Sequence, residues 1–130
     1  MTTRATGTYA TKSWNENPYH KEDGSATLTR ASVENTFTGD LVGDGILEYL
    51  MVYGADSSAT YVGLQRFEGT VGGRNGTFVA RIEGTFTSAA AENWIIVEGS
   101  GTGGLSGISG TGSVKSLDEK SAEYTVDYSI

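Results

Sequence analysis

Apolar and polar residues alternate along most of this chain, and short turn-like segments interrupt the alternation at regular intervals. Residues 27–38 read Thr-Leu-Thr-Arg-Ala-Ser-Val-Glu-Asn-Thr-Phe-Thr, a run in which every second residue shares one face of an extended strand. The chain has 19 glycines and a single proline to mark turns, and almost no stretch follows the 3.6-residue period of a helix. The pattern therefore predicts an all-β protein.

The alternation predicts eight strands, most of them joined by hairpin-sized turns. They span residues 6–14, 27–38, 42–54, 60–71, 77–86, 93–98, 107–114 and 122–130. The first connection is a longer polar loop containing Pro18, and residues 89–91 are small enough to form one helical turn. Eight short, evenly spaced strands are typical of a closed up-and-down barrel. We therefore predict a single domain over residues 1–130, an eight-stranded antiparallel barrel with a central lumen.

The third predicted strand, residues 42–54, is apolar on both faces, with Ile46 and Leu50 on one face and Leu47 and Tyr49 on the other. A strand of this kind is usually covered on both sides. In a barrel, this predicts a filled interior together with a partner subunit or another layer outside. We expect a homo-oligomer, either a dimer or a trimer.

Residues 99–112 form the most unusual stretch, because seven of the fourteen are glycine and none is charged. Gly99, Gly101 and Gly104 have the spacing of a dinucleotide-binding fingerprint, but that fingerprint needs a helix after it. More glycine follows instead, and glycine disfavours helix. The run therefore predicts a turn from the sixth strand into the seventh, where neighbouring backbones approach closely.

The overall composition excludes several classes of partner. The net charge is −7, and the nine Lys and Arg residues are scattered, which argues against nucleic acid and anionic membrane surfaces. The chain has no cysteine, so disulfides and thiol chemistry are excluded. No apolar run is long enough to cross a bilayer, and the first residues lack the apolar core of a signal peptide. We expect a cytoplasmic protein that binds neither nucleic acid nor membranes.

The sequence offers little support for a metal or a cofactor. His20 is the only histidine, and it lies beside Glu22 and Asp23 in a polar segment. Three such residues so close together in a loop are typical of a solvated turn rather than a metal site. We predict no metal and no cofactor.

Charged residues within the strands are the candidate polar groups of the lumen. We predict Glu48 and Arg30 as the catalytic or anchoring pair, with the alternative that they form a cross-strand ion pair on the outer face. Small-molecule pockets combine apolar walls with a few polar anchors. The residues that we expect to bind a ligand are Trp14, Asn15, Tyr49, Gln65, Arg66, Phe67 and Trp94.

Several short segments also form a recognisable combination. They are residues 13–16 (SWNE), 28–31 (LTRA), 37–40 (FTGD), 48–51 (EYLM), 62–66 (VGLQR), 72–78 (GGRNGTF) and 99–110 (GSGTGGLSGISG). Together they cover nearly the whole chain and resemble an uncharacterised bacterial family, labelled only as a domain of unknown function, with an allene-oxide-cyclase-like barrel. The glycine element is similar to one in dirigent proteins and plant allene oxide cyclases, which are oligomeric eight-stranded barrels that bind apolar molecules in the lumen.

The resemblance implies a barrel more directly than it implies a reaction. The family motif has a glutamate where this chain has Gln65, and the plant cyclases have an acidic residue and an asparagine where Ser13 and Asn15 look like the matching positions. The asparagine carries over and the carboxylate does not. Our hypothesis is a barrel that binds a small apolar molecule, with a cofactor-free cyclisation or isomerisation through enclosure. A non-catalytic carrier or sensor, or a structural barrel with a plugged lumen, are the alternatives.

Overall fold

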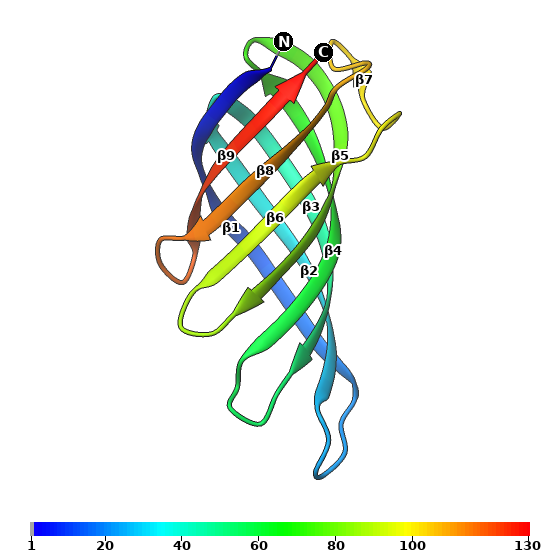
Figure 1. Cartoon of the computed structure of the whole chain (residues 1–130), viewed down its shortest axis with the longest axis vertical. Coiled ribbons are helices and arrows are strands. Elements are labelled where there is room, and N and C mark those ends of the chain that lie inside the picture. Colours follow the sequence, from blue (N-terminus) through cyan, green and yellow to red (C-terminus); the bar gives the residue numbers. More distant parts are fainter. Residues whose placement is uncertain (1) are drawn as a thin grey trace.

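The structure is a computed structural model that describes residues 2–130 as one antiparallel sheet closed into a barrel (Figure 1). Its strands are β1 (Thr3–His20), β2 (Thr27–Gly39), β3 (Leu41–Tyr53), β4 (Ala59–Val71), β5 (Arg74–Phe86), β6 (Ala90–Ile96), β7 (Thr102–Gly103), β8 (Ser109–Ser116) and β9 (Ser121–Ser129). Eight of them form a ring in the order β4-β3-β2-β1-β9-β8-β6-β5, which closes where β4 pairs with β5. The short β7 lies outside this ring and pairs only with β5. The predicted eight-stranded antiparallel barrel is confirmed.

The first strand is much longer than the sequence predicts. β1 continues to His20, so the prediction of a polar loop after residue 14 is wrong. β9 pairs with β1 only from Thr3 to Ala10, and the far half of β1 has β2 as its single ladder neighbour. Pro18 is tolerated there because a strand with one open edge does not need every backbone N–H. The β1–β2 hairpin therefore projects beyond the other turns (Figure 1).

Three smaller differences lie in the second half of the chain. β6 begins at Ala90, so the helical turn predicted at residues 89–91 is not formed. The seventh ring strand is displaced from residues 107–114 to Ser109–Ser116, and β7 is an additional strand that the pattern did not predict. The small residues at the start of β6 and in β7 are extended because their backbones pair with β5. The neighbouring strand therefore decides their conformation.

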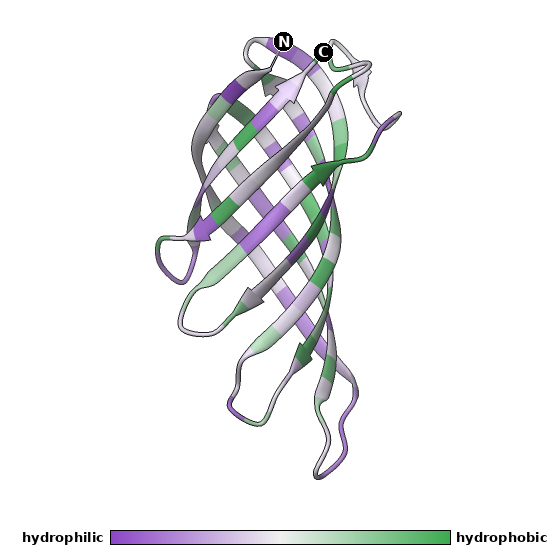
Figure 2. Cartoon of the chain, viewed as in Figure 1, coloured by the Kyte–Doolittle hydropathy of each residue, from purple (hydrophilic) through white to green (hydrophobic). Residues whose placement is uncertain are grey.

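Hydrophobic and hydrophilic residues alternate along the strands (Figure 2), and this alternation separates the inside of the barrel from the outside. On β2, Ala31, Val33, Asn35 and Phe37 are buried, whereas Ser32, Glu34 and Thr36 between them are exposed. An aromatic cluster fills part of the barrel interior. Its rings, with centroids 5.0 to 6.0 Å apart, belong to Tyr9, Phe37, Phe67, Phe78, Trp94 and Tyr124.

The glycine-rich run closes the end of the barrel where the two termini lie (Figure 1). Leu105 and Ile108, its only large apolar residues, are almost completely buried. Gly110 follows with a φ of 151°, and a Cβ there would overlap the carbonyl oxygen of Asp127 on β9. The run is therefore a loop that packs two side chains into the barrel end. The prediction of a simple turn between two strands was too coarse.

A β-bulge in β1 decides which of its residues face inward. Thr11 pairs with Asn35 and Ser13 pairs with Glu34, the residue adjacent to Asn35 in β2, so Lys12 is an extra residue. Inward positions change there from odd to even numbers, and Trp14 therefore faces the interior whereas Ser13 does not. The bulge places an indole where strict alternation would place a serine.

Among residues 2–130, no helix is long and apolar enough to cross a membrane.

Candidate functional site

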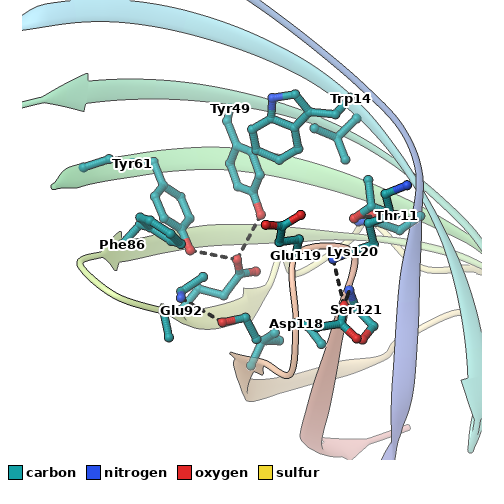
Figure 3. Close-up of a pocket in the computed structure, with 18 of the residues that line it drawn as sticks. Thr11, Trp14, Tyr49, Tyr61, Phe86, Glu92, Asp118, Glu119, Lys120 and Ser121 are labelled. Atoms are coloured by element: carbon teal, nitrogen blue, oxygen red, sulfur yellow. Dashed lines mark hydrogen bonds between the residues drawn. The ribbon is translucent and has the colours of Figure 1, made fainter. Parts of the chain in front are cut away.

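A cavity of about 590 Å³ occupies the half of the barrel that faces the hairpin turns (Figure 3). Its rim comes from four places: Trp14 on β1, the turn between β3 and β4, residues 86–90 between β5 and β6, and residues 117–120 between β8 and β9. Its inner wall includes Val33, Leu47, Met51 and Tyr61. The interior is therefore only partly filled by the protein's own side chains.

Glu92 is the only charged side chain buried in the barrel wall among residues 2–130. It lies on β6 and is 5% exposed. Its Oε1 accepts hydrogen bonds from the hydroxyls of Tyr49, at 2.9 Å, and Tyr61, at 3.0 Å, and its Oε2 accepts one from the indole Nε1 of Trp94, at 2.8 Å. Figure 3 shows both phenols converging on this carboxyl group at the cavity wall.

Burial and hydrogen bonding act on Glu92 in opposite directions. Burial raises the pKa of Glu92, since the charged form loses its hydration, while the hydrogen bonds from Trp94, Tyr49 and Tyr61 lower it. Burial is the larger effect, and the pKa is raised overall. Burial and the nearby Glu92 charge also raise the pKa of Tyr49 and of Tyr61. Glu92 is thus a carboxyl group that can exchange a proton closer to neutral pH than a surface glutamate can.

Tyr9 adds a hydrogen-bond donor to the same cavity. It lines the cavity from β1, and burial followed by the charge of Glu92 raises its pKa. Within residues 2–130, the Tyr9 hydroxyl makes no hydrogen bond. Every fully buried polar side-chain atom of these residues has a hydrogen-bond partner, so the Tyr9 hydroxyl is not fully buried. The Tyr9 hydroxyl is therefore open to the cavity and available to a bound molecule.

A second carboxylate, Glu16, ties three strands together at the rim. It accepts hydrogen bonds from Trp14 Nε1 at 2.9 Å, from the Thr29 hydroxyl at 2.7 Å and from the Tyr53 hydroxyl at 2.6 Å. Burial raises the pKa of Glu16, but the three hydrogen bonds outweigh it and hold the pKa below its usual value. Glu16 fixes the Trp14 ring, whose centroid lies 6.0 Å from that of Tyr49.

A polar chain crosses the interior beside the cavity. The Thr11 hydroxyl donates to Asn35 Oδ1 at 3.0 Å, and Asn35 Nδ2 donates to Gln65 Oε1 at 3.0 Å. Thr11 and Asn35 line the cavity, whereas Gln65 lies behind them. These groups satisfy each other, so they bound the cavity without demanding a ligand.

Two of the predicted ligand-binding residues, Trp14 and Tyr49, line the cavity. Three others point into the barrel without lining it: Gln65, Phe67 and Trp94 are each 1% exposed and belong to the packed interior. Trp94 reaches the site indirectly, because it donates to Glu92. The structure thus brings the aromatic predictions into one interior but places only part of them at the cavity.

Four predicted site residues lie on the outer surface instead. Arg30 and Glu48 form a cross-strand ion pair of 2.7 Å with both side chains exposed, so the prediction that they anchor a ligand in the lumen is corrected in favour of the alternative. Arg66 is exposed and 3.7 Å from Glu68. Asn15 is exposed because the bulge at Lys12 turns the residues on either side of it, Trp14 and Glu16, toward the interior.

The sequence interpretation missed both carboxylates that face the interior. Glu92 lay in a predicted connection, since the sixth strand was expected to begin at residue 93. Its spacing of two residues from Trp94 and four from Ile96 was the available signal, because all three share one face of β6. Glu16 had no such signal, because the bulge that turns it inward leaves no mark in the pattern.

The described residues offer no metal site. Within residues 2–130, no three His, Cys, Asp or Glu side chains converge as metal ligands would. His20 approaches Glu22 at 3.7 Å, and both side chains are exposed. Glu92 is surrounded by hydrogen-bond donors, which is the environment of a proton-exchanging or hydrogen-bonding carboxyl group.

Comparison with known proteins places the chain in a family. The family described as "Protein of unknown function (DUF3224)" matches residues 5–128. A crystal structure of a DUF3224 protein of unknown function from Shewanella oneidensis MR-1 is similar, with a TM-score of 0.82 and 28% identity over 100% of this chain and 98% of that one. No curated protein matches. The resemblance seen in the sequence segments is confirmed, and the chain belongs to the DUF3224 family.

Proposed function

We propose that this protein binds a small, largely apolar molecule in the barrel cavity, with a polar group of that molecule directed at Glu92. The carrying observation is the buried Glu92 carboxyl group in the wall of a cavity of about 590 Å³. Small-molecule sites commonly measure about 300–1,000 Å³ and combine apolar walls with few polar groups. The cavity matches that description in both size and composition.

The arrangement around Glu92 supports a ligand with a hydroxyl or carbonyl group. A carboxylate offers about four lone-pair positions, and three donors use three of them here. The remaining position, on Oε2, can accept a hydrogen bond from a ligand hydroxyl. The free hydroxyl of Tyr9 can donate one to a ligand carbonyl. One polar end and an apolar body would therefore fit the cavity.

Charge at the rim disfavours anionic ligands. Residues 117–120 contribute Asp118 and Glu119 against a single Lys120, and Glu92 adds a further carboxyl group inside. An incoming carboxylate or sulfonate would meet like charges in a partly desolvated site. We therefore infer that the ligand is neutral or cationic.

A cofactor-free isomerase is the second candidate, and the raised pKa of Glu92 is the observation that favours it. A buried carboxyl group of this kind can remove a proton from a carbon next to a carbonyl and return it to another carbon of the same molecule. The proton balance is closed, because the proton that leaves the ligand returns to it. A carrier would use the same cavity without proton transfer.

Binding of a neutral dye tests the proposal. We expect Nile red to gain fluorescence with the protein and the anionic dye 1-anilinonaphthalene-8-sulfonate to respond far less. Ala90→Phe fills the cavity wall and should weaken Nile red binding about tenfold or more, whereas Ala91→Phe, on the outer face, should not. Equal effects of the two variants, or no response to Nile red, would contradict a ligand in this cavity.

Deuterium exchange separates the isomerase from the carrier. The protein is incubated with an organic extract of bacterial cells, reisolated with any retained compound, and transferred to D₂O. An isomerase should introduce deuterium into that compound, as seen by mass spectrometry, and Glu92→Gln should abolish the mass gain. Retention without exchange supports a carrier, and a protein that retains nothing argues against both.

A further inference from the structure

The outer face of β2–β5 differs from the rest of the barrel surface. On β3 and β4, the outward residues include Ile46, Leu50, Val52, Val62 and Leu64, whose side chains are 42% to 56% exposed. Leu50 and Val62 lie directly opposite each other across the two strands, and Leu64 lies in the next row, opposite Glu48. Ile95 on β6 and Val97 just beyond it are 43% and 38% exposed and lie on the far side of β5, where Arg81 pairs with Ile95. A cluster of exposed apolar side chains is typical of an interface.

The middle of this face is electrically balanced within an acidic chain. Its charged residues, within residues 30–34, 46–52, 60–66 and 79–85, are Arg30, Glu34, Glu48, Arg66, Arg81 and Glu83, while Asp44 and Glu68 lie beyond them at one edge of the same face. The rest of the chain keeps six of the nine Lys and Arg residues and 13 of the 16 Asp and Glu residues. The middle of the face therefore carries no net charge that would oppose the approach of a second copy.

Two of those charges lack an intramolecular partner. Arg30 is paired with Glu48, and Arg66 approaches Glu68. Within the described part of the chain, Arg81 and Glu83 make no ion pair and no side-chain hydrogen bond. They lie two residues apart on the same face of β5, about 7 Å from each other along the strand.

The strand register shows how a second copy complements this pair. Leu64 on β4 pairs with Arg81 on β5, and Val62 pairs with Glu83, so these four residues form two adjacent rows. Consider a twofold axis that lies between the two rows, perpendicular to the strands and parallel to the sheet. It places a second copy face to face with the first and exchanges one row for the other. Arg81 of one copy then faces Glu83 of the second copy, and Leu64 faces Val62.

We propose that two copies of this chain form a twofold dimer through the outer face of β3, β4 and β5, with Arg81 of each copy paired to Glu83 of the other. In such an interface each contact occurs twice, as isologous association requires. The same axis brings Ile46 opposite Val52, because their rows lie equally far from it. A standard interface needs about 800 Å² per partner, roughly a tenth of the 7391 Å² that the whole chain exposes.

Charge reversal tests the proposal by analytical ultracentrifugation. The wild type should sediment with twice the monomer mass of 13.7 kDa. Arg81→Glu and Glu83→Arg should each raise the dimer dissociation constant about tenfold or more, because like charges then face each other at two positions. The control Glu123→Arg, an exposed glutamate on β9 at the opposite side of the ring, should leave the dimer intact.

Mixing the two single variants gives the decisive result. Arg81→Glu and Glu83→Arg are complementary to each other, so the equimolar mixture should form a heterodimer at concentrations at which each variant alone is largely monomeric. The double variant Arg81→Glu/Glu83→Arg should recover the homodimer. A monomeric wild type overturns the proposal, as does a dimer that survives both single reversals or a mixture that stays monomeric.

Discussion

Tyr49 on β3 and Glu92 on β6 meet across the barrel interior, where the phenolic hydroxyl donates a 2.9 Å hydrogen bond to Glu92 Oε1. They are 43 residues apart in the sequence, and the curvature of the closed sheet alone brings them together. Tyr61 and Trp94 complete the set of donors around the carboxyl group. This part of the interior therefore serves two purposes, because it holds the barrel together and presents one acidic group to the cavity.

Replacing Glu92 by glutamine tests the structural part of that role. The amide oxygen can accept from Tyr49 and Tyr61, but the amide NH₂ group then faces Trp94, whose indole can only donate. One buried donor loses its acceptor, so we expect Glu92→Gln to lower the free energy of unfolding in urea by about 1–3 kcal/mol. The exposed Glu123→Gln should change it by less than about 0.5 kcal/mol. Equal stabilities of the two variants would contradict this account of Glu92.

The raised pKa of Glu92 predicts a stability difference that depends on pH. In the folded state the neutral acid is favoured, so between the unfolded and folded pKa values the folded protein binds more protons. The contribution of neutral Glu92 to the free energy of unfolding is fully present below the pKa of glutamate in the unfolded chain, about 4.3. It is lost as the pH rises through the pKa of Glu92 in the folded protein. Wild-type protein should therefore lose stability relative to Glu92→Gln as the pH rises from 4 to 8. Urea unfolding of both proteins across this range measures the difference, and a difference that stays constant or changes in the opposite direction counts against the burial of Glu92.

Glu16 should behave in the opposite way. Its three hydrogen bonds outweigh its burial and lower its pKa, so its contribution is present above the unfolded pKa and is lost as the pH falls through the folded pKa. Compared with Glu16→Gln, the wild type should become less stable only toward acidic pH. Trp14 fluorescence should change over the same range, because protonation removes the charge that holds its indole N–H. A wild-type difference that grows toward alkaline pH would exclude this arrangement.

The fold was predictable because two-residue periodicity is a local property that a closed sheet obeys almost everywhere. β2, β3 and β4 confirm the predicted strands within a residue or two, and their inward residues form the core. The boundaries of β1 and β6 were less predictable. In β1 the pairing with β2 carries an otherwise loop-like sequence past Pro18, and in β6 pairing with β5 and β8 extends the small residues from Ala90 onward.

The candidate site was less predictable, for a physical reason that Glu48 illustrates. Alternation says that a residue lies on one of two faces, but it cannot say which face is inside when both carry apolar residues, as in β3. The bulge at Lys12 adds a further reversal that shifts Trp14 and Glu16 inward. The inward face of each strand becomes definite only when all eight strands close together.

Two glycines of the run that closes the barrel end should differ sharply when replaced. Gly107 has a φ of 83° and open space around its missing side chain, so Gly107→Ala meets only backbone strain and should cost about 1–2 kcal/mol. Gly110 has a φ of 151° and also lies directly over the Asp127 carbonyl oxygen, where neither strand can withdraw without breaking the β8–β9 ladder.

Gly110→Ala should therefore cost at least twice as much in urea unfolding, or prevent folding, while Gly107→Ala remains folded. Because this run lies at the end of the barrel opposite the cavity, Gly107→Ala should bind Nile red as the wild type does. Similar losses for both variants would mean that close approach of β9 is not what requires glycine at residue 110. A loss of dye binding in folded Gly107→Ala would mean that the glycine run contributes to the ligand site as well as to the fold.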